Sequence, residues 1–186
     1  SDIDPAVLVT EAGRVEAPKT RIVTVRDNVI HFDERIILPV RPMVGTIGVA
    51  PCDGATSLAA GDYGGNMDNK DVAPGSTLYV KAQVPLGLVY LGDLHAAMGD
   101  GEVSLNGVEI AGSIRLRVGL EKGMHLRNPM VETPDCWEVV VYDPDIERAI
   151  ELACEDMAHF LADRLGITLG EAVMLAGVAC DVRICQ

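Results

Sequence analysis

The segment GDYGGNMDNKDVAPGSTLYV spans residues 61–80, and its composition sets the architecture that we expect around it. Glycine, asparagine and aspartate have weak helix and strand propensities, so residues 53–76 are expected to form a loop. A loop of about 20 residues inside a compact chain is usually functional or disordered. Structured segments flank this one closely on both sides, which favours the functional alternative.

Outward from this loop, short apolar and β-branched runs predict strands on both sides. On the N-terminal side these runs are residues 7–9, 21–25, 28–32, 34–38 and 45–49. On the C-terminal side they are residues 77–84, 86–91, 113–121 and 137–142. Within residues 113–121 apolar and charged residues alternate, which is typical of a strand with one buried face. The pair Asn106 and Gly107 predicts a hairpin that joins residues 104–105 to residues 108–110.

The C-terminal part has a helical pattern. An apolar stripe at helical spacing runs from Ile146 to Leu161, and a second helix is expected to end near Ala179,. The capping signals are Asp143 with Pro144 before the first helix, Gly166 after it, and a Thr168–Glu171 capping box before the second,. Residues 181–186 then predict the start of a final strand. We therefore expect a single β-rich α+β domain over residues 1–186. Its β-rich core with the site loops covers residues 1–142, and the helical pair and final strand cover residues 143–186.

Charge and targeting features narrow the function. The net charge of −13 disfavours binding to nucleic acid and to anionic membrane surfaces,. Five cysteines, an odd number without a C-x-x-C pair, fit buried thiols in a reducing compartment,. The N-terminal SDIDPAVLV lacks a basic region, and no run approaches the length of a membrane span. We therefore expect a cytoplasmic protein with neither a signal peptide nor a membrane segment.

A second acid-rich segment, LGDLHAAMGDGE at residues 91–102, carries the residues that indicate chemistry. Asp93 and His95 are two residues apart, so both side chains point to one side if the segment is extended. Asp100 and Glu102 repeat that spacing after a short turn. One histidine with carboxylates suits a divalent metal that keeps an open position for water. Such a metal brings the pKa of water near neutrality, and a nearby carboxylate can take the proton.

The alternative is a turn-rich hairpin whose acids are solvated and whose histidine packs in the interior. Two observations weigh against it. Gly92, Gly99 and Gly101 bracket the acids and permit close approach of a ligand to the backbone,. Clustered acids also repel one another unless a cation or a proton separates them. Both observations favour a functional site.

Several long motifs resemble the acetamidase/formamidase family. They are RPMVGTIGVAP (41–51), GDYGGNMDNKDVAPGSTLYV (61–80), LGDLHAAMGDGEVS (91–104), VEI (108–110) and DVRICQ (181–186). The resemblance covers most of residues 36–186. It implies a β-sandwich or barrel, and an enzyme that hydrolyses short aliphatic amides, such as formamide or acetamide, to ammonia and the acid. It also implies a divalent metal, zinc or calcium, and a homo-oligomer.

Carried over motif by motif, the resemblance assigns three groups of residues. Substrate binding falls to Asp62, Asn66 and Asp68, with Asn66 orienting the amide; metal binding to Asp93 and His95; catalysis to Glu102 as general base, with Asp100 and Lys70. The sequence leaves Lys70 open, because it could stabilise an oxyanion or simply pair with Asp68 or Asp71.

One departure from the family keeps a second function open. Members are longer, so we expect this chain to lack the family's N-terminal segment and extreme C-terminus. The alternative function is therefore a non-catalytic or incomplete subunit, a metal- or ligand-binding β-module that needs a companion chain. Cys52 as a nucleophile is a weak competitor, because no motif of a cysteine amidase surrounds it,.

Overall fold

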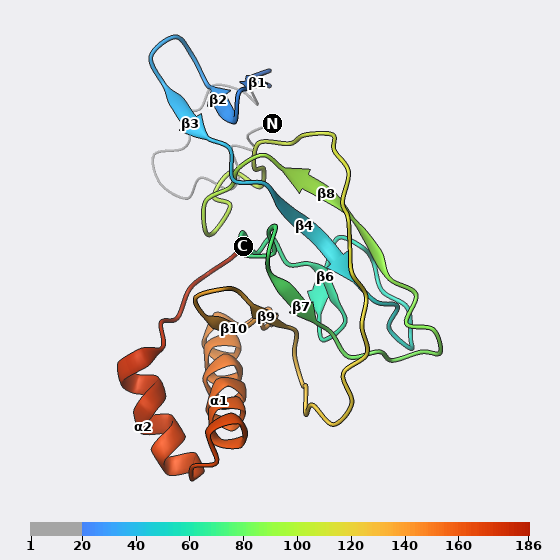
Figure 1. The fold of residues 1–186 in the computed structure, drawn as a ribbon, viewed down its shortest axis with the longest axis vertical. Coiled ribbons are helices and arrows are strands. Elements are labelled where there is room, and N and C mark those ends of the chain that lie inside the picture. The colour runs from blue at the N-terminus through green and yellow to red at the C-terminus, as the bar shows by residue number, and fades with distance from the viewer. Residues whose placement is uncertain (1–19) are drawn as a thin grey trace.

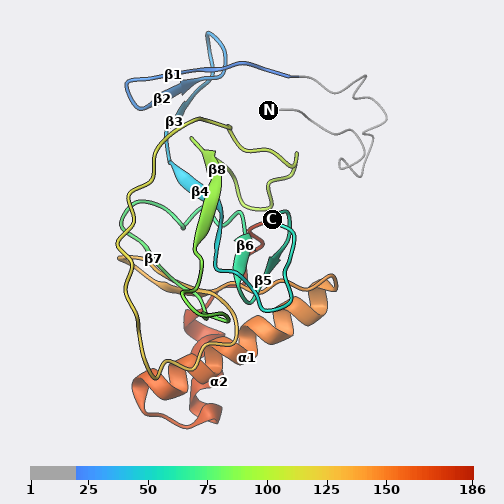
Figure 2. The same cartoon turned by 90° about the vertical axis from the view of Figure 1, so that its right-hand side faces the viewer.

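The computed structural model describes residues 20–186, which form three antiparallel sheets and two helices. The sheet of β1, β2 and β3 lies at one end of the molecule and the helices lie at the other (Figures 1 and 2). The described residues contain no closed barrel. The expected β-rich α+β fold with a C-terminal helical pair is confirmed, whereas the strand expected at residues 7–9 lies outside the described residues.

The first sheet has the order β1-β2-β3, with β1 at Thr24–Arg26, β2 at Val29–His31 and β3 at Ile37–Pro39. Asp27 and Asn28 join β1 to β2 with φ of 53° and 59°. Positive φ at both central residues is the hairpin turn that matches the twist of the strands, and Asn and Asp adopt it readily. The strands predicted at residues 21–25, 28–32 and 34–38 are therefore present but shorter, and β1 and β3 each end one residue later than predicted.

The central sheet has the order β5-β6-β4-β8, with β5 at Ala60–Gly61, β6 at Gly64–Asn66, β4 at Met43–Gly48 and β8 at Tyr90–His95. β5 and β6 lie inside residues 53–76, so the prediction of a continuous loop there was wrong. Glycine has a weak strand propensity, which is why no strand was predicted. In the structure, however, neighbouring strands lie so close that a larger residue would not fit. A Cβ on Gly64 would lie 2.4 Å from the backbone oxygen of Ile47 on β4.

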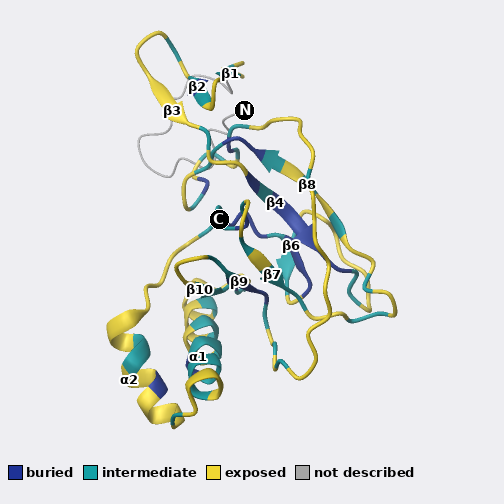
Figure 3. Ribbon diagram, viewed as in Figure 1, coloured by how far each residue is buried: buried dark blue, intermediate teal, exposed yellow. Residues whose placement is uncertain are grey.

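The third sheet has the order β10-β9-β7, with β10 at Trp137–Val139, β9 at Met130–Glu132 and β7 at Thr77–Tyr79. Side chains from the central and third sheets share one core, and the buried residues gather along β4 and β9 (Figure 3). That core consists of Ile47, Met67, Val72, Val131 and Val140. The ring of Trp137 lies 4.8 Å from that of Phe160, which joins this sheet to α1.

The helices are α1 at Ile146–Leu165 and α2 at Leu169–Ala179, and they pack against each other. The expected N-cap of the first helix was wrong by two residues. The carboxylate of Asp145 accepts from the backbone N–H groups of Glu147 and Arg148, whereas Asp143 accepts from Asp145 before the helix begins. The C-cap at Gly166, with φ of 65°, and the Thr168–Glu171 capping box are confirmed. Over residues 20–186, neither helix is long and apolar enough to cross a membrane.

Four predicted strand features differ in the structure. The strand predicted at residues 86–91 is displaced, because β8 overlaps it only at residues 90–91. Residues 113–121 belong to no strand, and Val118 and Leu120 are 74% and 78% exposed. Residues 108–110 pair with the end of β8 rather than with residues 104–105, since Ala96 N–H donates to Val108 O. Residues 181–186 also belong to no strand. Alternation predicts that a strand can form, but not whether a partner edge is available.

Candidate active site

His95, at the end of β8, lies at the centre of a group of four carboxylates. Its Nε2 lies 3.3 Å from Asp93 Oδ1, 3.2 Å from Glu109 Oε1 and 3.9 Å from Glu102 Oε1. Its Nδ1 lies 4.0 Å from Asp68 Oδ1. We call Asp68, Asp93, His95, Glu102 and Glu109 the His95 cluster. Sequence segments more than 40 residues apart therefore meet at one imidazole ring.

Three members of the cluster are almost fully buried, which is unusual for charged groups. Asp68 is 1%, His95 2% and Glu102 6% exposed. The side chains of Asp93 and Glu109 are 34% and 42% exposed. The cluster is therefore closed on the Asp68 side and open to solvent beside Asp93 and Glu109, on the Nε2 side of the ring.

Three of the four carboxylates lie on residues with positive φ. Asp68, Asp93 and Glu102 have φ of 41°, 60° and 34°, a region that aspartate enters more readily than most residues but that is uncommon for glutamate,. Such conformations persist where the surrounding structure enforces them, and they gather at functional sites. At Asp68 the enforcement is visible, because the N–H groups of Met67 and Asp68 both donate to the carbonyl of Gly45.

Electrostatics of the cluster favour protons or a cation. Burial, with the nearby charges of Glu102 and Asp93, raises the pKa of Asp68 to about 6,. Burial likewise raises the pKa of Glu102 and of Glu109. Within residues 20–186, no lysine or arginine forms an ion pair with any of the four carboxylates. Asp68 Oδ1 and His95 Nδ1 are moreover buried without a hydrogen-bond partner.

Asn66, at the end of β6, is linked to the cluster through Thr46 on β4. The Thr46 hydroxyl lies 2.5 Å from Asn66 Oδ1 and 3.1 Å from Asp93 Oδ2. Gly45 lies directly beneath the acids, and a Cβ there would be 2.5 Å from Asp68 Oδ1 and 2.8 Å from Asp93 Oδ2. The acids can approach one another because residue 45 has no side chain.

Lys70 and Asp100 lie in a second acidic group. Lys70 Nζ donates to Asp100 Oδ2 at 2.7 Å, and Arg183 contacts Asp71, Asp100 and Glu138. We call these five residues the Arg183 network. Burial opposes ionisation of Asp100, but hydrogen bonds from Lys70 and Arg183 outweigh it and lower the pKa. Asp100 and Glu102 diverge because Gly101 and Glu102 both have positive φ, so the expected shared orientation is absent.

Asp62 lies apart from both groups. It is exposed, between β5 and β6, and accepts a hydrogen bond from Gln83. Gly64 pairs with Gly48, and His95 pairs with Met43 at the other end of β4. At about 3.3 Å per residue, that offset is roughly 17 Å along the strand. Of the predicted site residues, the structure thus brings together Asp68, Asp93, His95 and Glu102, with Asn66 attached.

Sequence reasoning missed Glu109, Thr46 and Arg183. Glu109 reaches His95 because residues 108–110 pair with the end of β8, where His95 and Glu109 form a bridge. The signals were indirect, since VEI and DVRICQ were recognised as similar to family motifs without a role for either charged residue. Pairing between distant segments could not be deduced from local pattern.

Two overlapping sets of cluster residues could hold a metal ion. Ligand atoms within 4.8 Å of one another come from Asp68, Asp93 and His95, and from His95, Glu102 and Glu109. Nitrogen and carboxylate oxygens together suit zinc, and the abundance of carboxylates also suits calcium. The two unpartnered buried atoms fit the same interpretation, because each is a potential ligand that makes no hydrogen bond of its own.

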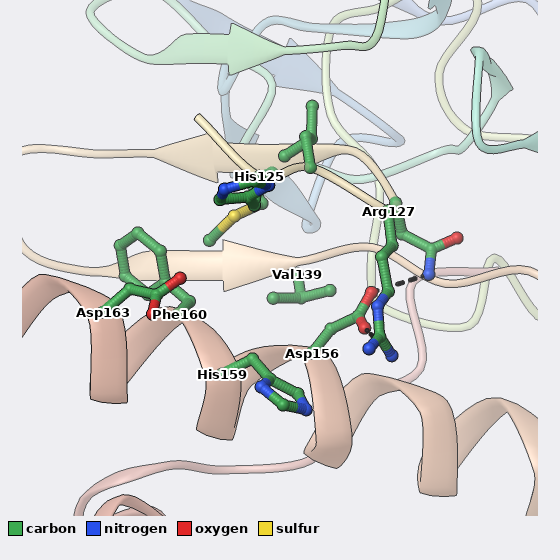
Figure 4. Close-up of a pocket in the computed structure, with 10 residues that line it drawn as sticks. His125, Arg127, Val139, Asp156, His159, Phe160 and Asp163 are labelled. Atoms are coloured by element: carbon green, nitrogen blue, oxygen red, sulfur yellow. Dashed lines mark hydrogen bonds and ion pairs between the residues drawn. The ribbon is translucent and has the colours of Figure 1, made fainter. Parts of the chain in front are cut away.

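A concavity of about 320 Å³ lies elsewhere, between α1 and the segment that leads into β9. Figure 4 shows His125, Arg127, Asp156 and His159 around it. Arg127 and Asn128 both contact Asp156, so Arg127 and Asp156 of this concavity are already paired. None of its lining residues belongs to the His95 cluster or to the Arg183 network.

Known proteins are similar to this chain in both sequence and fold. A formamidase of Methylophilus methylotrophus is 29% identical over 151 residues, which are 70% of this chain and 37% of that protein. The crystal structure of an acetamidase from Bacillus halodurans matches with a TM-score of 0.93 and 34% identity, over 100% of this chain and 63% of that one. A predicted acetamidase/formamidase from Thermoanaerobacter tengcongensis matches with a TM-score of 0.89 and 35% identity, over 96% of this chain and 59% of that one.

The chain therefore spans under two thirds of the length of these relatives. The sequence model of the Acetamidase/Formamidase family matches residues 40–186, which include both acid-rich segments and the Arg183 segment. Because that match covers most of the chain, the chain belongs to the Acetamidase/Formamidase family.

Proposed function

We propose that this chain hydrolyses short aliphatic amides, such as formamide or acetamide, at the His95 cluster with the help of a divalent cation. The observation that carries the proposal is that the carboxylates of the cluster have no lysine or arginine partner within the described residues. Four carboxylates surround one histidine without a lysine or arginine among residues 20–186, and Asp68 Oδ1 and His95 Nδ1 lack partners. Burying such a group is costly unless a cation or protons complete it.

The imidazole nitrogens and carboxylate oxygens of the His95 cluster suit a divalent cation. His95, Asp93 and Asp68 would hold it from one side, and Glu102 and Glu109 flank the same ring. The imidazole nitrogen favours zinc over calcium. When bound, a divalent cation would polarise the amide carbonyl and make a nearby water more acidic.

The chain's own residues supply the remaining functions. Glu102, buried and with a raised pKa, would take a proton from the attacking water and give it to the departing nitrogen,. The water oxygen bonds to the carbonyl carbon, the C–N bond breaks, and the products are ammonia and the carboxylic acid. The hydroxyl of Thr46 contacts the Asn66 oxygen, which leaves the Asn66 nitrogen able to donate to the amide substrate,.

The test combines binding with turnover. Zinc chloride is titrated into the metal-free chain by calorimetry, and ammonia release from formamide and acetamide is measured before and after a chelator. We expect saturable zinc binding and ammonia release that the chelator abolishes and zinc restores. Ammonia release that is insensitive to the chelator would contradict the role of the cation, and its complete absence would contradict hydrolysis.

A second candidate function is a metal- or ligand-binding module that acts only with a partner surface, either another copy or a companion chain. The observation that favours it is the exposure of Val118 and Leu120 in a segment whose alternation predicts one covered face,. Zinc binding by the purified chain without ammonia release from either amide would favour this candidate. Turnover by the chain alone would contradict it.

A further inference from the structure

Residues 181–186, which follow α2, return from the helices to the sheets (Figure 1). We call them the C-terminal strap. Although the strap belongs to no strand, it contacts the 99–102 turn at two points. The Gly101 N–H donates to Cys185 O at 3.0 Å, and Gln186 Nε2 donates to Glu102 Oε2 at 3.4 Å. Cys185 also packs against the core shared by the central and third sheets. The strap therefore lies against the turn that carries Glu102.

Arg183 is the main polar anchor of the strap. Its Nη2 lies 2.9 Å from Asp71 Oδ2 and 3.2 Å from Asp100 Oδ1, and its Nη1 lies 3.3 Å from Glu138 Oε1. These acids come from three separate places: the segment after β6, the 99–102 turn and β10. One guanidinium thus ties three segments together through its fixed, planar set of donors.

The 99–102 turn also has contacts that do not involve the strap. Glu102 N–H donates to Gly99 O, Leu105 N–H donates to Glu102 O, and the Gly107 N–H donates to the Glu102 carboxylate. Glu102 itself has φ of 34°. Asp100, two residues earlier, is held from two sides by Lys70 and Arg183. Asp100 and Glu102 lie on the same turn, and the Glu102 carboxylate lies 3.9 Å from His95 Nε2.

We propose that Arg183 is a positioning residue of the active site: through Asp100 and the strap, it fixes the turn that presents Glu102 to His95. Arg183 itself does not contact the His95 cluster, so it acts through the turn. The role in turnover rests on the proposed amide hydrolysis, whereas the ordering of the turn and the effect on metal binding do not. Hydrogen exchange and zinc affinity test the second part independently of turnover.

Arg183→Gln removes the charge, and Arg183→Lys keeps the charge but loses the forked donors. Arg127→Gln is the matched control, because Arg127 is also an exposed arginine paired with two acids, Glu155 and Asp156, away from the cluster. Each variant is measured for hydrogen exchange of residues 99–103, for zinc affinity by calorimetry, and for kcat and KM of ammonia release from formamide.

We expect Arg183→Gln to speed exchange in residues 99–103 more than in α1, and to weaken zinc binding. We also expect kcat to fall by at least about tenfold with KM changed far less, since small misplacement of a catalytic group is costly. Arg183→Lys should lie between wild type and Arg183→Gln, and Arg127→Gln should match wild type. If Arg183→Gln does not fold, Arg183→Lys alone carries the comparison.

Wild-type exchange and wild-type zinc affinity in a folded Arg183 variant would overturn the proposal. A uniform rise of exchange throughout the chain would also overturn it, because it would indicate a general stabilising role. If the wild-type chain releases no ammonia, the proposed hydrolysis fails, and exchange and zinc affinity still decide the role of Arg183.

Discussion

The His95 cluster and the Arg183 network are two acid-rich groups that both draw on residues 68–71 and 100–102, yet their acids have different partners. In the Arg183 network, Asp71, Asp100 and Glu138 each form an ion pair with Arg183, and Asp100 also pairs with Lys70. In the His95 cluster, none of the four acids forms an ion pair with a lysine or arginine of residues 20–186, and Asp68 Oδ1 and His95 Nδ1 make no hydrogen bond. Both groups bring three or more acids together, so the clustering of acids alone does not reveal a site. What distinguishes the candidate site is that its acids have no lysine or arginine partner within residues 20–186.

The strongest test of this contrast removes the one nitrogen ligand. We expect His95→Gln to reduce kcat/KM for ammonia release by at least about 100-fold, the usual contribution of a positioned acid–base or ligand group. Zinc affinity should fall with it. His159→Gln is the control, because the His159 side chain lies on α1, is 45% exposed, and has Glu155 as its ion-pair partner among residues 20–186. Unchanged zinc binding and turnover in His95→Gln would show that the site lies elsewhere.

A methyl group placed between the acids should have the next largest effect. The Cβ in Gly45→Ala would meet the carboxylates of both Asp68 and Asp93, so they must move apart. We expect zinc affinity to fall by at least about tenfold, comparable with disturbing the surroundings of a metal ligand. Calorimetric titration measures it against Gly119→Ala, whose Cβ would meet nothing within 4 Å. Equal affinities in the two variants would mean that the close approach of the acids is not needed.

The raised pKa of Asp68 in the cluster also predicts how the free energy of unfolding depends on pH. The folded protein raises the pKa of Asp68 from 3.8 to about 6, so it binds this proton more tightly than the unfolded chain. The stability that Asp68 contributes is therefore greatest below pH 3.8 and is lost as the pH rises to about 6,. The loss amounts to at most about 3 kcal/mol.

Denaturant unfolding of the metal-free wild type and of Asp68→Asn, between pH 4 and pH 7, isolates this contribution. We expect the wild type to lose stability relative to Asp68→Asn as the pH rises. Saturating zinc at pH 7 should restore the wild type selectively, because binding to the native state adds to its stability. Parallel pH profiles for the two proteins would refute the interpretation.

The smallest effect on stability and turnover is expected from a substitution in the Arg183 network. Lys70 and Asp100 are 36% and 32% exposed, and an exposed pair of this kind contributes less than about 1 kcal/mol,. We therefore expect Lys70→Gln to unfold at nearly the wild-type denaturant concentration and to release ammonia within about tenfold of the wild-type rate. A loss near 100-fold with unchanged stability would place Lys70 in the chemistry, as an oxyanion-stabilising group.

Local chemistry in the sequence was sufficient to identify several elements. The Gly166 C-cap and the Thr168–Glu171 capping box depend on neighbouring residues, and both were predicted correctly. The family and the contact between Asp93 and His95 were likewise apparent from contiguous motifs. The N-cap of the first helix was predicted at Asp143 but lies at Asp145, two residues later, because either aspartate can cap a helix.

The pairing of distant segments was decided only by the tertiary structure. Residues 113–121 alternate like a strand but find no sheet edge, whereas residues 64–66 form β6 beside β4, which lies too close for a side chain at Gly64. Glu109 joins His95, and Arg183 joins Asp100, only after the chain has folded. The sequence by itself determined which residues could act as acids, caps and ligands, since these are properties of single residues and their neighbours. Contacts between segments far apart in the chain decided which acids have a lysine or arginine partner within residues 20–186 and which do not.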